Sequence, residues 1–238
     1  MTNVIIIHTH DTGRYISPYG YPAQTNNLEK ISNIGFTYRN AFTVAPTCSP
    51  SRAALLTGLY PHQNGMFGLA HRGSKLKDYQ LHLSNFLKKN NYETALFGIQ
   101  HEIKQNNIST LGYNHIEIDQ NKNSSKIAKS ASKWLKKYNS EKPFFMSIGF
   151  FDTHREYPKE VSANFDPRWQ RPPEIFFDNQ ELRLDMARFY TSLEKVDKGI
   201  GLIMKTLEQK SKLDETLIII TTDHGIAWPG MKCNLNDH

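Results

Sequence analysis

Four apolar runs of strand length constrain the fold of this chain most. Each is followed by side chains of the types that can bind metals or transfer protons. The runs span residues 4–7, 94–99, 144–151 and 217–220. Continuous apolar runs of this length are typical of strands buried on both faces of a parallel sheet. The polar residues that follow them are His10 and Asp11, His101 and Glu102, Asp152 and His154, and Asp223 and His224. Each predicted strand therefore ends in candidate ligands.

Helical patterns separate these runs. Residues 79–90 predict one helix, and apolar side chains three and four residues apart predict a long amphipathic helix that ends near residue 209. Alternating strands and helices predict right-handed βαβ units and an α/β fold with a doubly wound, mostly parallel sheet and helices on both faces. Ligands bind at the carboxyl ends of the strands in such sheets, so the polar side chains should meet in one site.

The 238 residues, 38% of them hydrophobic and 22% charged, suit a single α/β domain over residues 1–238 and exclude fibrous and wholly disordered classes. The formal net charge of +6 favours anionic partners. Lysine and arginine form no stripe interleaved with aromatic residues, so we predict no nucleic-acid partner. The lysines of residues 126–137 are interpreted as a solvated helix face. No apolar stretch approaches the ~20 residues that cross a bilayer, so no membrane span is expected.

The N-terminus, the cysteines and the prolines give weaker indications of location, disulfide content and loop structure. The N-terminus has no basic segment and too short an apolar run for a signal peptide, which predicts a cytoplasmic protein, or a periplasmic or secreted one if a signal has been removed. Two cysteines are too few for a disulfide framework, and Cys233 is interpreted as a free thiol. Residues 157–180 include four prolines and predict a long irregular loop that either faces the substrate or packs on the surface.

The segment around Cys48 carries the most specific signal. Ser49 is predicted to cap a helix, with Pro50 at its first position and Gly58 just past its end. Cys48 would then lie beside a helix N-terminus, with Arg52 one turn away, and these positive charges predict an unusually acidic, reactive thiol. The alternative is a small buried core cysteine.

The run Cys48-Ser-Pro50-Ser-Arg52, followed by Leu-Thr-Gly58, resembles the C-x-P-x-R…TG signature of sulfatases, in the alkaline-phosphatase-like superfamily. Residues 36–43 and 57–66 are most similar to the heparan N-sulfatase (sulfamidase) branch. The resemblance implies that a maturase oxidises Cys48 to formylglycine. The hydrated aldehyde then attacks the sulfur of a sulfated saccharide and later expels sulfate.

The same resemblance implies roles for metal ligands and for groups that stabilise the nucleophile. Arg52 matches the partner of the formylglycine. Asp11 and Asp223 match metal ligands at the ends of the first and last strands. Their oxygen atoms favour Ca²⁺, with Mg²⁺ as an alternative.

Three further residues match groups that handle the substrate. His101 matches a histidine that hydrogen-bonds the diol, and His154 matches the histidine that protonates the leaving group. Lys232 matches the basic residue that grips the sulfate.

Four positions depart from the family pattern. His10 stands where the family usually has an aspartate, and His224 stands where it has an asparagine. Two imidazoles would soften the site and make a transition metal an alternative to Ca²⁺. Ile99 replaces an expected sulfate-binding lysine, and Glu102 is an additional carboxylate that would contact substrate or orient the neighbouring histidine. The predicted metal set is His10, Asp11, Cys48, Asp223 and His224.

Sulfatases of this kind are longer, with a C-terminal subdomain that completes the sheet edge and the pocket. We therefore expect an incomplete catalytic domain without that subdomain, of reduced stability. Two other functions stay open. One is a phosphodiesterase or phosphonate monoester hydrolase, because relatives with the same nucleophile cleave P–O bonds. The other is a non-catalytic remnant that binds sulfated glycans.

Overall fold

The computed structural model describes residues 2–119 and 122–234, whose strands form one five-stranded parallel sheet. The strands are β1 (Asn3–Thr9), β2 (Glu93–Gly98), β3 (His115–Glu117), β4 (Phe144–Gly149) and β5 (Thr216–Thr222). They are arranged in the order β3-β2-β4-β1-β5, and every pair is parallel. All carboxyl ends therefore lie at the same end of the sheet. The predicted α/β fold with a parallel sheet is confirmed.

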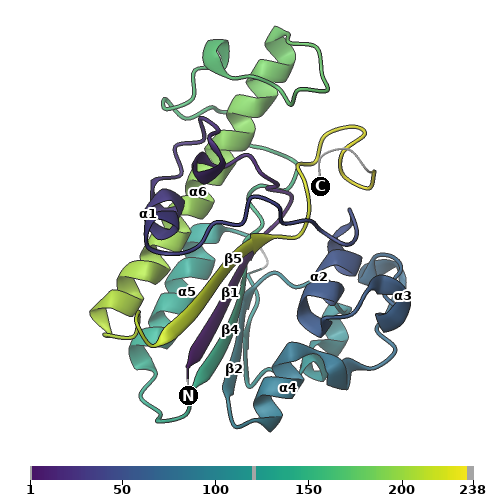
Figure 1. Ribbon diagram of the computed structural model, residues 1–238, viewed down its shortest axis with the longest axis vertical. Coiled ribbons are helices and arrows are strands. Elements are labelled where there is room, and N and C mark those ends of the chain that lie inside the picture. The colour runs from purple at the N-terminus through teal and green to yellow at the C-terminus, as the bar shows by residue number, and fades with distance from the viewer. Residues whose placement is uncertain (1, 120–121, 235–238) are drawn as a thin grey trace.

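Helices cover both faces of the sheet (Figure 1). One face carries α1 (Asn26–Ile34), α5 (Ser124–Lys137) and α6 (Gln180–Gln209). The other carries α2 (Cys48–Thr57), α3 (Pro61–Asn64) and α4 (Leu83–Lys89). Short 3-10 helices span Ser17–Tyr19, Ala70–Arg72, Tyr79–Leu81, Gln105–Leu111 and Pro167–Trp169.

Alternation along β1 assigns its side chains to the two cores. Ile5 and Ile7 pack in the core beneath α5 and α6, whereas Ile6 packs in the core on the α2 side. Because successive side chains point to opposite faces, His8 falls on the α2 side, where it meets that helix. The strand thus delivers a polar group to the helix that carries Cys48.

The elements differ from the predicted ones in three places. The helix predicted over residues 79–90 divides into the 3-10 turn Tyr79–Leu81 and α4, because the His82 backbone is extended and caps α4. The three-residue strand β3 was not predicted. Strand β5 is not buried on both faces, because it is the sheet edge, where Leu217 and Ile219 are 53% and 39% exposed. As predicted, the loop that begins at residue 157 is irregular apart from one 3-10 turn, and it ends at residue 179, just before α6 begins.

Within the described ranges, no helix is both long and apolar enough to span a membrane. The helix α5 has the predicted form, with buried Ile127, Ala128, Ala131 and Leu135 on one face and lysines on the other. Helix α6 ends at Gln209, as its apolar spacing predicts.

Candidate active site

Cys48 lies at the first position of α2 rather than ahead of it. Thr47 is the residue before the helix, so the predicted cap at Ser49 is wrong. Ser49 is already inside the first turn, and its hydroxyl accepts a hydrogen bond from the Ala70 backbone N–H at 3.1 Å instead. Gly58 ends the helix as predicted, with a left-handed φ of 69° and its N–H donating to the Ala54 carbonyl. The result is a buried Cys48 whose side chain points at the ends of β1 and β5.

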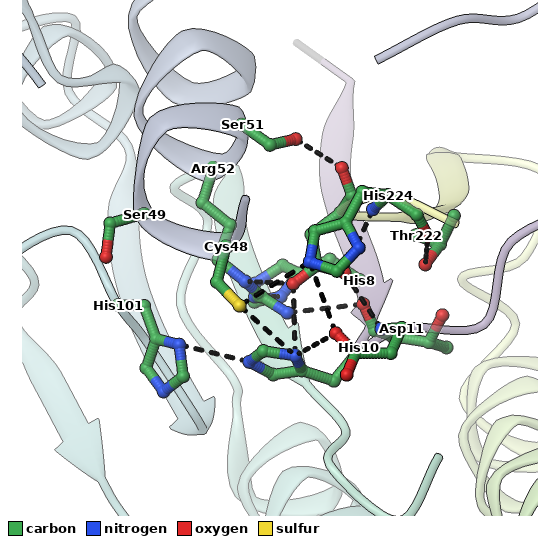
Figure 2. A network of polar contacts seen from close by, with 12 residues as sticks. His8, His10, Asp11, Cys48, Ser49, Ser51, Arg52, His101, Thr222 and His224 are labelled. Carbon is green, nitrogen blue, oxygen red and sulfur yellow. Dashed lines mark hydrogen bonds and ion pairs between the residues drawn. The ribbon is translucent and has the colours of Figure 1, made fainter. Parts of the chain in front are cut away.

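The Cys48 sulfur faces two histidines. Its Sγ lies 3.5 Å from His224 Nε2 and 3.9 Å from His10 Nδ1, and all three side chains are buried (Figure 2). His10 follows β1 and His224 follows β5, which are neighbours in the sheet. Adjacent strands therefore bring together residues more than two hundred positions apart.

Two buried carboxylates complete this cluster. Asp11 has a left-handed φ of 52°, which turns the chain sharply after β1, and its backbone N–H donates to Asp223 Oδ1 at 2.9 Å. His10 Nδ1 lies 3.1 Å from both Asp11 Oδ1 and Asp223 Oδ2. His224 Nε2 lies 3.2 Å from Asp11 Oδ1. Non-glycine residues with positive φ are uncommon and concentrate at functional sites.

Arg52 supports the cluster from beneath and is itself 1% exposed. Its Nε donates to Asp223 Oδ2 at 3.1 Å and its Nη2 donates to the Thr9 carbonyl at 3.2 Å. Its Nη1 donates to Nδ1 of His8, whose Nε2 is 2.9 Å from the Ser147 hydroxyl. His8 is not among the predicted site residues. Its even position on β1, two residues before His10, was the available signal.

A second group of side chains lies beside the carboxylates. Lys232 Nζ donates to Asp11 Oδ2 at 2.6 Å and is 3.1 Å from His154 Nε2. Burial lowers the pKa of Lys232, but Asp11, together with Cys48 and Asp223, raises it overall above its ordinary value. Burial lowers the pKa of His154, against the opposing effect of Asp11. The two side chains are 20% and 28% exposed, so this end of the cluster reaches solvent.

His101 reaches the cluster through His10, because its Nδ1 is 3.0 Å from His10 Nε2. Glu102 does not reach it. The Glu102 carboxylate is buried and folds back to accept the His101 backbone N–H at 3.1 Å, and burial raises its pKa. A carboxylate held inside the protein in this way is not placed to contact substrate. It remains suited to orienting the His101 loop.

The prediction of an unusually acidic Cys48 thiol is wrong. Burial raises the pKa of Cys48 to about 12, and the Asp223 carboxylate adds to this effect. Lys232 and Arg52 oppose it without reversing it. Burial also opposes ionisation of Asp223, but His10 and the Arg52 guanidinium hold the pKa of that carboxyl below its ordinary value. The negative charge of this site is therefore on the carboxylates and not on sulfur.

Two other strand-end residues lie outside the cluster. Asp152 Oδ2 accepts the Ser124 backbone N–H at 2.8 Å, so it supports the start of α5. Ile99 is buried and apolar where the family resemblance placed a lysine.

A cavity of about 700 Å³ opens next to the partly exposed end of the cluster. Its lining residues include His154, Arg155, Glu181, Trp228 and Lys232. A second cavity, of about 740 Å³, is lined by residues at the amino ends of β1 and β4 and contains none of the cluster. Only the first of these two cavities can bring a ligand to Lys232 and His154.

The family model described as Sulfatase matches residues 2–236. This chain belongs to the sulfatase family. Among curated relatives, the human N-sulphoglucosamine sulphohydrolase is 28% identical over 265 residues, which cover 98% of this chain and 52% of the relative. This chain therefore spans about half the length of that relative.

Solved structures agree on the fold of this chain. A Bacteroides fragilis protein assigned as a sulfatase superposes with a TM-score of 0.81 at 21% identity, over 99% of this chain and 64% of the other. The phosphonate monoester hydrolase of Agrobacterium radiobacter superposes with a TM-score of 0.74 at 17% identity, over 94% and 63%. At these identities the likeness concerns the fold alone.

Proposed function

We propose that this chain carries the catalytic centre of a sulfatase that releases sulfate from a sulfated saccharide, as an O-sulfate ester or an N-sulfamate. The nucleophile would be a formylglycine made from Cys48 by a maturase. The observation that carries this proposal is the convergence of Cys48, at the start of α2, with Asp11, Asp223 and Lys232 from the carboxyl edge of the sheet. Sulfate transfer needs such preorganised charges around the reacting group.

The two groups that this site would acquire have complementary chemistry. A formylglycine at position 48 supplies a hydrated aldehyde as nucleophile, and a divalent cation beside it supplies positive charge for the sulfate oxygens. The donor atoms of His10, Asp11, Asp223 and His224 lie close enough together to hold that cation. Arg52 fixes the orientation of Asp223 through the hydrogen bond from its Nε to Asp223 Oδ2.

The chain's own residues would bind sulfate and deliver a proton. The Lys232 ammonium reaches the open end of the cluster, so it can bind a sulfate oxygen while remaining paired with Asp11. His154 hydrogen-bonds the Arg155 carbonyl through Nδ1, which leaves Nε2 to face the site. A proton held at that Nε2 is placed to meet the departing oxygen or nitrogen, and solvent can replace it because the His154 side chain is 28% exposed.

The saccharide would occupy the cavity of about 700 Å³, whose walls include His154 and Lys232. Trp228 and Leu182 give this cavity apolar surface, and Glu181 gives it a carboxylate that can accept hydrogen bonds from hydroxyl or amino groups. The human relative is named for N-sulphoglucosamine, which supports an amino-sugar N-sulfate as the first substrate to test.

Mass spectrometry tests the nucleophile first. The chain is produced in a host with a maturation system, and the tryptic peptide of residues 40–52 is weighed. We expect the mass of formylglycine at position 48, together with release of sulfate from an aryl sulfate or N-sulfoglucosamine. Cys48→Ala should abolish that release, and Cys233→Ser is the matched control. An unmodified cysteine with no sulfate release would contradict the proposal and favour a glycan-binding remnant that retains heparin without turnover.

A phosphonate monoester or phosphodiester hydrolase is the second candidate. The fold likeness to a phosphonate monoester hydrolase favours testing it. Parallel assays with aryl sulfate and aryl phosphonate esters separate the two by the ratio of their kcat/KM values. A ratio in favour of phosphonate would replace the first candidate with the second.

A further inference from the structure

The donor atoms of the Cys48 cluster are of mixed type. His10, Asp11, Cys48 and Asp223 are all buried and each offers one atom, the four lying within 4.8 Å of one another. His224 Nε2 adds a fifth donor, 3.5 Å from the Cys48 sulfur. Nitrogen and sulfur thus stand where a hard cation would require oxygen.

The hydrogen bonds of the two imidazoles present ring nitrogens to the cluster centre. His224 Nδ1 is 2.9 Å from the Gly225 carbonyl, so Nδ1 donates to that oxygen, and in the neutral imidazole Nε2 then carries a lone pair. That lone pair faces Asp11 Oδ1 at 3.2 Å, a contact that is favourable only with positive charge between the two atoms. His10 Nε2 is engaged by His101, which leaves His10 Nδ1 between the two carboxylates. Metal-bound histidines are oriented in this way by a partner on the other ring nitrogen.

The charges of the two carboxylates are already balanced by cationic side chains that lie outside the set of donor atoms. Lys232 binds Asp11 and Arg52 binds Asp223, each through a buried or half-buried ion pair. Two carboxylates with two cationic partners leave little negative charge for Ca²⁺, which takes six to eight oxygen ligands. Imidazole and thiolate ligands instead suit zinc and related first-row ions.

We propose that this cluster binds a transition ion of the zinc type in preference to Ca²⁺, through His10, His224 and the two aspartates. In the unconverted chain, the Cys48 sulfur completes the set. The proposal rests on the metal dependence of the proposed function, but it is read out by metal binding and not by turnover.

Metal retention tests it. The full chain is stripped of metal, equilibrated with Zn²⁺, Ca²⁺ or Mg²⁺, passed through a desalting column and analysed for elements. We expect about one zinc ion per chain, with Ca²⁺ at least about 100-fold weaker in competition. Equal or tighter binding of Ca²⁺, or loss of all three ions, would overturn the proposal.

Variants locate the ion. The double variant His10→Asp/His224→Asn supplies oxygen donors, so it should lose zinc preference and gain Ca²⁺ binding. The exposed His62→Asn is the matched control and should change neither. Unchanged zinc affinity in the double variant would contradict the assigned ligands.

Cobalt provides a readout that does not depend on those variants folding. Co²⁺ added to the stripped, unconverted chain should give a thiolate-to-cobalt charge-transfer band that Cys48→Ser removes and Cys233→Ser keeps. Absence of the band would overturn the assignment of Cys48 as a ligand. A chain that binds zinc but releases no sulfate would contradict the proposed function alone, whereas activity that requires Ca²⁺ would contradict the metal assignment alone.

Discussion

At the scale of single residues, burial decides the chemistry of the two cysteines. A pKa of about 12 leaves only about one Cys48 thiol in ten thousand ionised at pH 8. Cys233 is exposed and free. We therefore expect iodoacetamide at pH 8 to alkylate Cys233 within minutes and to leave Cys48 unmodified in the metal-stripped native chain. Peptide mass spectrometry measures both sites. Unfolding in urea should abolish the difference, and rapid alkylation of native Cys48 would contradict the burial argument.

His8 carries the second residue-scale prediction, because it is the acceptor for Nη1 of Arg52. His8→Leu leaves that buried guanidinium N–H without its partner, which costs about 1–3 kcal/mol. We expect a lower melting temperature and a kcat for sulfate release reduced by about tenfold or more, with KM nearly unchanged.

His8→Asn is the control for this prediction. An asparagine oxygen can take the place of Nδ1, so this variant should recover much of kcat. Equal losses in the leucine and asparagine variants would indicate a packing role for His8 instead.

At the scale of elements, Asp152 joins the end of β4 to the start of α5. Its carboxylate accepts the Ser124 N–H at 2.8 Å, so Asp152→Ala should lower the free energy of unfolding by about 1 kcal/mol. Asp152→Asn keeps an acceptor and should lose less. Urea unfolding measures both. Metal retention should stay unchanged, and its loss would make Asp152 an additional metal ligand.

His82 makes the start of α4 sensitive to pH. It accepts the Ser84 N–H at the helix N-terminus, and burial lowers its pKa from 6.5 to about 4. Between these values the unfolded chain binds more protons than the native chain, so the stabilisation present above pH 6.5 is lost as the pH falls toward 4. We expect the titration of His82 to lower the free energy of unfolding by about 2 kcal/mol between pH 7 and pH 5.

The test compares urea unfolding at the two pH values. His82→Asn retains a capping oxygen and does not titrate, so its loss of stability between pH 7 and pH 5 should be smaller by that amount. The exposed His71→Asn should behave like the unchanged chain. An identical loss in His82→Asn would remove this histidine from the pH response.

Element periodicity explains how far the sequence predicts this fold. The four long strands were predictable to within about two residues because apolar runs and parallel pairing agree. Strand β3 has three residues, too few for a pattern, and the break at His82 depends on one backbone conformation.

The candidate site was also predictable where it depends on the regular sheet and not where it depends on local side-chain direction. Strand-end position predicted that His10, Asp11, Asp223 and His224 would converge, because a parallel sheet gathers its carboxyl ends. It could not separate Asp152, whose carboxylate turns toward α5, since side-chain direction depends on which helix lies nearby.

At the scale of the whole molecule, two groups of exposed apolar side chains are candidates for association with another chain. Residues 34–44 expose Phe36 and Phe42 to 91% and 76%. On β5, Ile218 and Ile220 pack against the core beneath α6, while Leu217 and Ile219 point to the α2 side of the sheet and are exposed. Within the described part of the chain, β5 pairs only with β1.

An exposed edge strand with apolar side chains is a template for association with a second strand. We therefore expect this chain to self-associate at micromolar concentration and to bind the dye ANS. Leu217→Lys/Ile219→Lys should reduce both effects and keep the circular dichroism spectrum, because these side chains bury little in the folded chain. Phe177→Lys, which changes a side chain that is 92% exposed elsewhere, is the matched control and should alter association less. Sedimentation velocity measures the outcome. Association that is unchanged by the β5 variant but lost in Phe36→Ser/Phe42→Ser would assign it to residues 34–44 instead of the sheet edge.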